Sequence, residues 1–111
     1  MLSNEEVKKI RSTHIAEGSR LPRIFSVLGD ANRWRIFTLL IEYNDLCVTD
    51  LANVLEVSVP AVSQQLRMME MSGLIAKERE GQKICYQVSK NDPVTRVIVR
   101  LVKTFKRSRI Q

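Results

Sequence analysis

The polar side chains between Ser58 and Arg67 are the residues of this sequence best suited to hydrogen-bond to the edges of DNA bases. Gln64 and Gln65 each offer a donor and an acceptor that match an adenine edge, and Ser63 can bond a base or a phosphate. Arg67 is expected to pair with phosphate, and Val59 and Pro60 to touch thymine methyl groups. The residues predicted to reach DNA from this segment are Ser58, Val59, Pro60, Ser63, Gln64, Gln65 and Arg67.

The sequence has two cysteines, Cys47 and Cys85, and one histidine, His14. Two cysteines are too few for a disulfide framework, so a disulfide between them would act as a switch. One thiolate cannot by itself hold a soft metal, which takes three or four ligands. His14 lies in a polar stretch and is expected to be exposed, and the methionines near residue 70 are expected to pack in a core. We therefore predict neither a metal site nor a cofactor.

Catalysis needs a positioned acid, base or nucleophile. With one histidine, no glycine-rich phosphate loop and no paired carboxylates on an apolar helix face, the sequence does not predict an enzyme. The net charge of +6 is concentrated at one end: up to Asp92 there are 12 basic and 12 acidic residues, and the remaining six basic residues follow with no acid among them. This basic tract could contact nucleic acid or form a solvated helix face.

The length of 111 residues predicts one domain, and 44% hydrophobic with 27% charged residues is ordinary for a folded protein. The longest apolar run is far shorter than the roughly 18 residues that a membrane span needs. The N-terminal residues mix acids and bases, unlike a secretory signal. We expect a cytoplasmic protein with no membrane partner.

A series of helices must position the polar segment. Hydrophobic periodicity predicts helices over 4–15, 21–28 and 31–43, a minimal strand over 46–48, and helices over 50–56 and 59–71. Asp30, Thr49 and Ser58 are the expected N-caps, and Gly73 ends the last of these helices. The 31–43 helix is apolar nearly all round and should be the buried centre of the domain.

From Leu74 the hydrophobic period changes to two, which predicts a β-hairpin over 74–79 and 83–88. Asp92 followed by Pro93 then begins a final helix. The fold class is mainly α with a small β-hairpin wing, a winged helix-turn-helix. The single predicted domain comprises an N-terminal arm or helix (1–18), the helix-turn-helix (49–73), the wing (74–88) and a dimerisation helix (92–107). Lys77, Arg79 and Lys83 on the wing would contact the DNA backbone.

Helix-turn-helix packing needs a small residue in its first helix and a β-branched one ten positions later, and Ala52 and Val62 meet this requirement. Glu56 replaces the usual turn glycine, at a cost of roughly 1 kcal/mol for left-handed backbone. The expected core positions around the crossing are Leu51, Leu55, Val57 and Leu66, and the core line of the second helix is Ala61, Val62, Leu66 and Met69.

From Leu21 to about Val102, the segments LGDANRWRIFTLL, DLCVTDLANVLEVS, VPAVSQQLRMMEMSGLI and EREGQKICYQVS occur in an order that resembles the ArsR/SmtB family of bacterial metal- and redox-responsive repressors. The resemblance implies a homodimer, joined through its first and last helices, that binds a palindromic operator and leaves it when an inducer binds. The sequence departs from the family's metal motifs. Thr49 replaces the second cysteine of a Cys-x-Cys pair, the last helix lacks histidine and acid, and Gln65 replaces a usual histidine.

Large apolar side chains on the terminal helix also favour a dimer, although they could instead pack on the chain's own core. The predicted interface is Leu21, Ile24, Val94, Val97, Ile98, Leu101, Val102 and Phe105. A dimer would place two recognition helices about 34 Å apart on an imperfect palindrome. We expect a repressor whose inducer is unknown, and we favour a thiol-linked or other non-metal signal over a metal ion. The alternative is a winged helix that binds protein or RNA and has no inducer.

The short strand of a winged helix usually pairs with the second wing strand, which would set Leu46-Cys47-Val48 against Ile84-Cys85-Tyr86. Alternation then directs Leu46 and Tyr86 into the core and both cysteines to the opposite face. Opposed residues are about 4.5 to 5.5 Å apart between Cα atoms, within reach of a disulfide. We hypothesise that an oxidant or reactive sulfur species links Cys47 to Cys85 and lowers DNA affinity; the alternative is two unrelated thiols.

Overall fold

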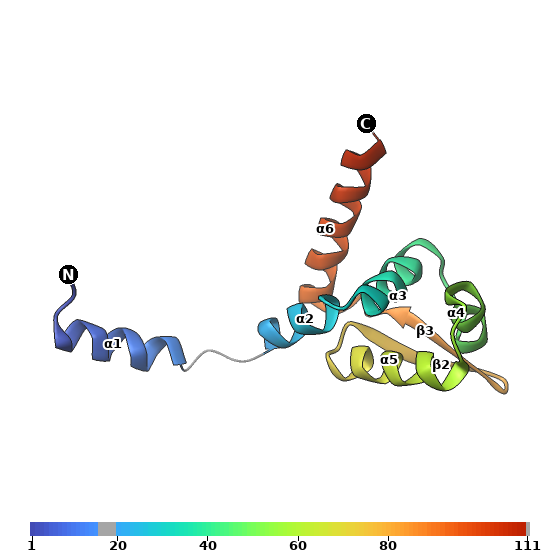
Figure 1. Ribbon diagram of the computed structural model, residues 1–111, viewed down its shortest axis with the longest axis horizontal. Coiled ribbons are helices and arrows are strands. Elements are labelled where there is room, and N and C mark those ends of the chain that lie inside the picture. Colours follow the sequence, from blue (N-terminus) through green and yellow to red (C-terminus); the bar gives the residue numbers. More distant parts are fainter. Residues whose placement is uncertain (16–19, 111) are drawn as a thin grey trace.

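The computed structural model describes residues 1–15 and 20–110, and it describes the side chains of these residues except 15 and 107–110. The elements are α1 (Asn4–Ile15), α2 (Arg20–Leu28), α3 (Ala31–Glu42), β1 (Leu46–Cys47), α4 (Val48–Leu55), α5 (Val59–Met71), β2 (Ile75–Glu80), β3 (Lys83–Val88) and α6 (Pro93–Ile110) (Figure 1). This order confirms the predicted series of helices, wing and final helix.

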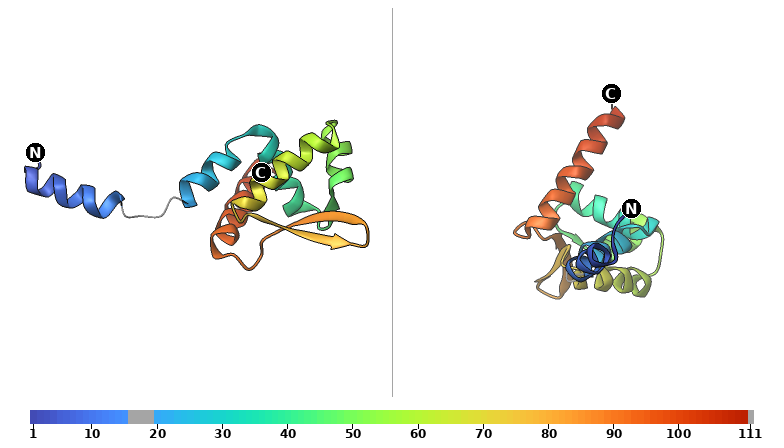
Figure 2. Two further views of the ribbon diagram at one scale, coloured as in Figure 1. Left: turned by 90° about the horizontal axis from the view of Figure 1, so that it is seen from below. Right: turned by 90° about the vertical axis from the view of Figure 1, so that its left-hand side faces the viewer.

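The elements that flank the polar segment lie on one side of the molecule. Helix α5 lies beside α4 and the β2–β3 hairpin, whereas α6 rises on the opposite side, above α2 and α3 (Figures 1 and 2). Helix α1 stands apart from this body in Figure 1 and in the left view of Figure 2. The C-terminal part of α6, the predicted dimerisation helix, therefore points away from α5, the helix predicted to read DNA (Figure 1).

The three strands form an antiparallel sheet in the order β1-β3-β2. Leu46 pairs with Tyr86 and Cys47 with Cys85, which is the predicted register. Val48 was expected in the strand, but it is the first residue of α4. The expected cap, Thr49, is also wrong: Cys47 occupies the N-cap, and its backbone N–H donates to the Asp50 carboxylate at 3.0 Å.

The other predicted helix caps are confirmed. The Asp30 carboxylate accepts hydrogen bonds from the backbone N–H groups of Asn32 and Arg33 at the start of α3. The Ser58 hydroxyl accepts one from Ala61 at the start of α5. Glu56 ends α4 with a φ of 56°, the predicted left-handed turn conformation. The connection between α4 and α5 is therefore tight, because both of its ends are fixed locally.

The core lies between α2, α3, α4, α5, α6 and the sheet. Its buried members include Ile24, Ile36, Phe37, Leu40, Leu51, Ala52, Val62, Leu66, Met69, Tyr86, Ile98 and Val102. Four expectations are wrong. Met68 and Met71, expected to pack in the core, are 41% and 81% exposed, because only Met69 lies on the inward side of α5. Val57 and Ala61 are exposed, since the left-handed turn at Glu56 carries the chain out to the surface before α5 begins. Helix α3 is also not buried all round, because Trp34 lies on its solvent side.

Within residues 4–15 and 20–110, no helix is both long enough and apolar enough to cross a bilayer.

Candidate nucleic-acid interface

The first two turns of α5 present an open polar surface. Ala52 and Val62 are both buried, as predicted, and the packing of α4 on α5 fixes which side of α5 faces outward. The outward set comprises Ser58, Val59, Pro60, Gln64 and Arg67, all exposed, with Ser63 half-buried beside the wing. A helix that exposes its N-terminal turns in this way has the geometry to enter a major groove.

Gln65 does not belong to this surface. Its side-chain oxygen accepts a hydrogen bond from the Arg33 guanidinium at 3.0 Å, and Arg33 also donates to the backbone oxygen of Val27 at 2.7 Å. Gln65 thus joins α5 to α3 and the end of α2. The signal was present in the sequence, since Gln65 follows Val62 by three residues and precedes Met69 by four. Sequence reasoning overlooked this spacing, and it missed Arg33 altogether.

The wing has a basic face and an acidic face. In β2 the side chains of Lys77 and Arg79 alternate with those of Glu78 and Glu80, and the pairing of Lys77 with Tyr86 puts the basic pair on the core side of the sheet. Lys83 pairs with Glu80 and so lies on the acidic side, apart from Lys77 and Arg79. The three wing cations therefore do not form one patch.

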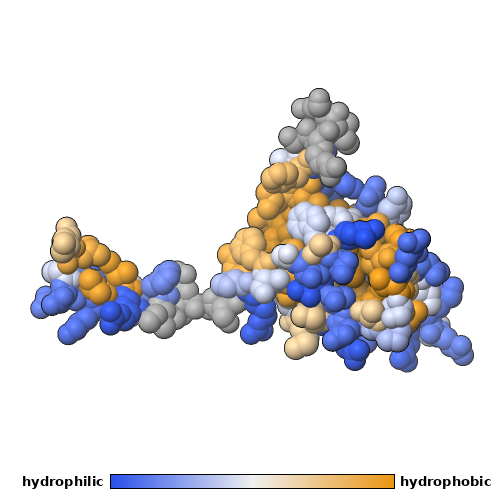
Figure 3. Space-filling model, viewed as in Figure 1, coloured by the Kyte–Doolittle hydropathy of each residue, from blue (hydrophilic) through white to orange (hydrophobic). Residues whose placement is uncertain are grey.

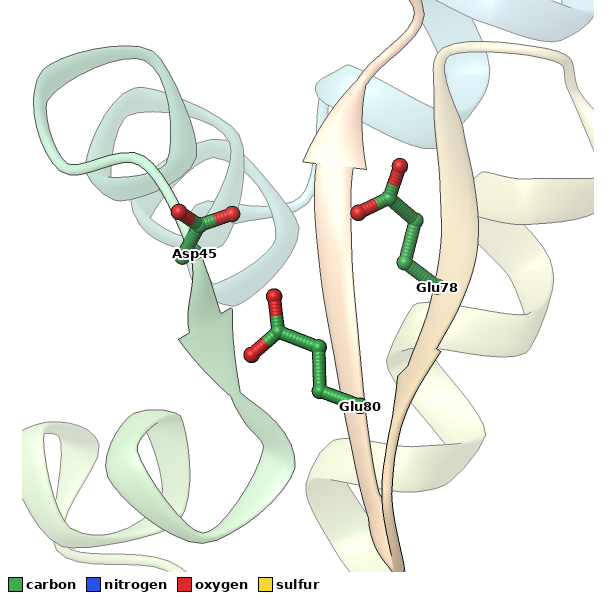
Figure 4. Close-up of side chains that lie close together, drawn as sticks. All are labelled: Asp45, Glu78 and Glu80. Atoms are coloured by element: carbon green, nitrogen blue, oxygen red, sulfur yellow. The ribbon is translucent and has the colours of Figure 1, made fainter.

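Asp45, Glu78 and Glu80 converge on the outer face of the sheet, with one carboxylate oxygen from each within 4.8 Å of the others (Figure 4). The side-chain amide of Gln87 donates to Asp45 at 2.7 Å and to Glu78 at 2.9 Å. All three acids are exposed. Because carboxylates repel phosphate, this acidic face of the wing is unfavourable for contact with a DNA backbone.

Cys47 and Cys85 form a disulfide across the β1–β3 pair, with Cα atoms 3.8 Å apart. The bond connects the N-cap of α4 to the middle of β3. Cys85 is 1% exposed and Cys47 is 9% exposed, so the bond is nearly covered. A disulfide here covalently joins the first helix of the helix-turn-helix to the wing.

A hollow of about 280 Å³ lies next to this bond. It is lined by the start of α4, the first turns of α5 and the tip of the wing: Cys47, Val48, Thr49, Val59, Ser63, Gln82, Lys83 and Ile84. Cys47 and the base-reading candidates Val59 and Ser63 thus share one cavity. Cys47 therefore borders the outward set of α5 (Ser58, Val59, Pro60, Ser63, Gln64 and Arg67), which we term the reading surface.

The side chains do not fit the metal sites of the resembled family. The sulfur of Cys47 is bonded to Cys85, and Thr49 offers a hydroxyl where a second thiolate would be required. His14 is exposed on α1, which stands apart from this region (Figure 1). This donor set is not one that holds a soft metal.

Exposed apolar side chains gather along α6 and over α2 (Figure 3). They are Leu21 and Phe25 on α2 and Val97, Leu101 and Phe105 on α6. Three residues assigned to a dimer interface, Ile24, Ile98 and Val102, are instead buried in the protomer's own core, and Val94 is half-buried against it. The physical reason is the width of the apolar stripe of α6: one edge of the stripe packs into the core, and the other edge remains exposed.

An ion pair fixes the start of α6. The Arg20 guanidinium donates to both carboxylate oxygens of Asp92, and the Thr95 hydroxyl donates to Asp92 at 2.6 Å. These bonds to Arg20 and Thr95 hold the pKa of Asp92 well below its usual range. Arg20 also lies against Gly73, whose φ is 85°. The beginnings of α2 and α6 are therefore held together beside the end of α5.

Residues 30–77 match the family model of the bacterial regulatory protein, arsR family. The chain is 35% identical over 71 residues to the arsenical resistance operon repressor of Escherichia coli, covering 64% of this chain and 61% of that protein. It is 32% identical over 89 residues to the transcriptional repressor SmtB homolog of Synechocystis, and the match covers 78% of this chain and 67% of that protein. This chain belongs to the ArsR family.

ArsR-family membership agrees with the architecture. A homodimeric winged helix-turn-helix DNA-binding domain from Mycobacterium bovis superposes with a TM-score of 0.70 at 17% identity, covering 98% of this chain and 91% of that one. The chain thus has the winged helix-turn-helix fold and belongs to the ArsR family of bacterial regulatory proteins. The matches span about three fifths to two thirds of the two curated relatives.

Proposed function

We propose that this ArsR-family chain is a homodimeric repressor that reads a palindromic operator with α5 and is released by oxidation of Cys47 and Cys85. The observation that carries the DNA-reading part is the orientation of α5. Its buried contacts with α4 turn Ser63 and Gln64 toward the wing side and solvent, while Arg67 lies one turn further along for a phosphate. The relatives named as repressors support the same role.

The proposed dimer uses the exposed edge of α6 and the neighbouring face of α2. Phe105 is 66% exposed and Phe25 is 60% exposed, which is unusual for large apolar side chains in a protein of this size. Covering these side chains, together with Leu21, Val97 and Leu101, with a second copy would remove them from water. Two-fold symmetry would then place two copies of α5 on successive major grooves.

The DNA test uses duplexes from the region upstream of the gene and a scrambled duplex of the same composition. Fluorescence anisotropy at two salt concentrations should show tighter binding to the upstream duplex. Arg67→Gln should weaken binding to both duplexes and reduce the salt slope by about one. A matched control, Arg35→Gln on the exposed side of α3, should change neither. Equal affinity for the two duplexes would contradict operator recognition.

The redox step requires a two-electron oxidant, here hydrogen peroxide. The Cys47 thiolate attacks one peroxide oxygen, the O–O bond breaks, and the products are a sulfenic acid and, after protonation, water. The Cys85 thiol then attacks the Cys47 sulfur, the S–O bond breaks and a second water leaves. The two thiols lose two electrons and the peroxide gains them. Cys47 reacts first because it lines the hollow at the wing, whereas Cys85 is covered.

Bond formation is proposed to lower operator affinity by restraining the wing. Groove binding requires α5 and the wing to adjust to the duplex together, and the disulfide fixes β3 to the N-cap of α4 beside Ser63. Peroxide should therefore release wild-type protein from the operator, and dithiothreitol should restore binding. Cys85→Ser should stay bound.

The Cys47→Ser/Cys85→Ser double variant controls for oxidation of methionine, because Met71 is 81% exposed and can react with peroxide. Release of the double variant by peroxide, to the same extent as wild type, would exclude the cysteine switch while leaving operator recognition intact. Peptide mass spectrometry of unreduced protein should detect the Cys47–Cys85 link only after oxidation.

A further inference from the structure

A second hollow, of about 530 Å³, lies far from the reading surface, between α3 and α6. Its wall is formed by the second half of α3, the segment that joins β3 to α6, and one side of α6. The lining residues are Leu40, Ile41, Asn44, Val88, Ser89, Lys90, Thr95, Arg96, Val99, Arg100 and Lys103. This volume is in the range of small-molecule sites.

The hollow is positively charged. Lys90, Arg96, Arg100 and Lys103 contribute four cations, and none of the residues named in its lining is acidic. Three acids lie close to the lining residues along the chain, and each is engaged elsewhere. Glu42 accepts a bond from Lys106 at 2.7 Å, Asp92 is paired with Arg20, and Asp45 accepts a bond from the Gln87 amide at 2.7 Å. Among the described residues these four cations make no ion pair, so an anion that entered the hollow could bind them.

The base of the hollow is apolar. Leu40 is buried, and Ile41, Val88 and Val99 are half-buried side chains that pack against the core. A small inorganic anion would leave these groups facing water, whereas a ligand with a hydrocarbon body would cover them. Cations beside an apolar base therefore favour a ligand with one anionic end and one apolar end.

The hollow and the proposed dimer surface occupy different sides of α6. At 100° per residue, Val97, Leu101 and Phe105 lie to one side of the buried line through Ile98 and Val102. Val99 and the cations at 96 and 103 lie to the other side, which faces α3. A second copy seated on the apolar side would thus leave the hollow open.

We propose that this hollow binds a small amphipathic monocarboxylate, with its carboxylate at Arg96 and Arg100 and its apolar body against Ile41 and Val99. The bound ligand would contact α6 and also Ser89, which directly follows the wing strand β3. It would thereby alter the angle between the dimer helix and the wing and lower operator affinity. Only this regulatory effect rests on the proposed function; binding does not.

Calorimetric titration tests the binding. The probes are octanoate, octanol as its uncharged counterpart, and inorganic phosphate as a bare anion. Octanoate should bind wild-type protein once per chain, and binding should weaken at least about tenfold in Arg96→Gln/Arg100→Gln because two charge-assisted contacts are lost. Both arginines are exposed, so the fold should survive, and circular dichroism checks this. Arg35→Gln, which removes a cation outside the hollow, should bind octanoate like wild type.

Three results would overturn the site: no heat from octanoate at millimolar concentration, equal binding by the double variant, or equal binding of octanol or phosphate to wild type. Operator binding with and without octanoate is then measured by anisotropy, and octanoate should weaken it in wild type but not in the double variant. Octanoate binding to a protein that ignores the operator would reject the proposed function but keep the site. Operator binding without octanoate binding would reject the site alone.

Discussion

Replacing Gln64 or Gln65 by alanine removes the same amide from neighbouring positions of α5, yet the two changes should have different consequences. Gln64 is exposed on the reading surface, whereas Gln65 is half-buried and bonded to Arg33. The pair is a matched test of the proposed orientation of α5. A helix rotated by one residue would exchange their roles.

The magnitudes follow from these contacts. Gln65→Ala deletes one hydrogen bond to a charged donor, worth about 1.5 to 3 kcal/mol in full burial and about 1 kcal/mol at this partly exposed site. For a domain of this size that loss lowers Tm by about 4–8 °C. Gln64→Ala deletes no intramolecular bond within the described residues and should change stability by less than about 0.5 kcal/mol. It should instead cost about 1–3 kcal/mol of operator discrimination.

Thermal unfolding by circular dichroism and anisotropy with operator and scrambled duplexes measure both quantities on the same samples. Gln64→Ala should retain its Tm and lose affinity for the operator but not for the scrambled duplex. Gln65→Ala should unfold earlier, and any change in its affinity should be equal for the two duplexes. If Gln65→Ala kept its Tm and lost operator affinity selectively, the orientation of α5 argued from Arg33 would be refuted.

Three further outcomes are expected. Leu101→Glu should sediment as a folded monomer and bind operator weakly, because the carboxylate would be desolvated at the proposed dimer contact; an intact dimer would contradict that interface. Since the pKa of Asp92 is lowered in the folded state, its contribution to stability is present above the unfolded pKa of about 3.9 and is lost as pH falls below it. The gap in urea midpoint between wild type and Asp92→Asn should therefore be constant near neutral pH and shrink below about pH 4; a gap that widened in acid would be inconsistent. Gly73→Ala should lower Tm more than Gly81→Ala, because both glycines have positive φ but a Cβ at Gly73 would also meet Arg20 at 2.8 Å.

The sequence by itself determined the elements and their order. Helix periods, the caps at Asp30 and Ser58, and the glycine turns are local features, because each depends on residues within one or two turns. The usual strand pairing of a winged helix placed Cys85 opposite Cys47, and alternation assigned both to one face, since strands with one buried face have little freedom of register. The helix-turn-helix was predictable for a similar reason: Ala52 and Val62 lie close in sequence, and both are buried on either side of one tight turn.

Only the tertiary structure decided which side of each helix contacts another element and which side faces solvent. Gln64 and Gln65 are indistinguishable by type, and Arg33, 32 residues away, separates their roles. Ile98 packs inward and Leu101 outward because α2 and α3 cover just part of a wide apolar stripe on α6. The cationic hollow likewise joins α3 to a helix more than fifty residues later. Such contacts depend on how distant elements are arranged, and a periodicity read along the chain does not contain that information.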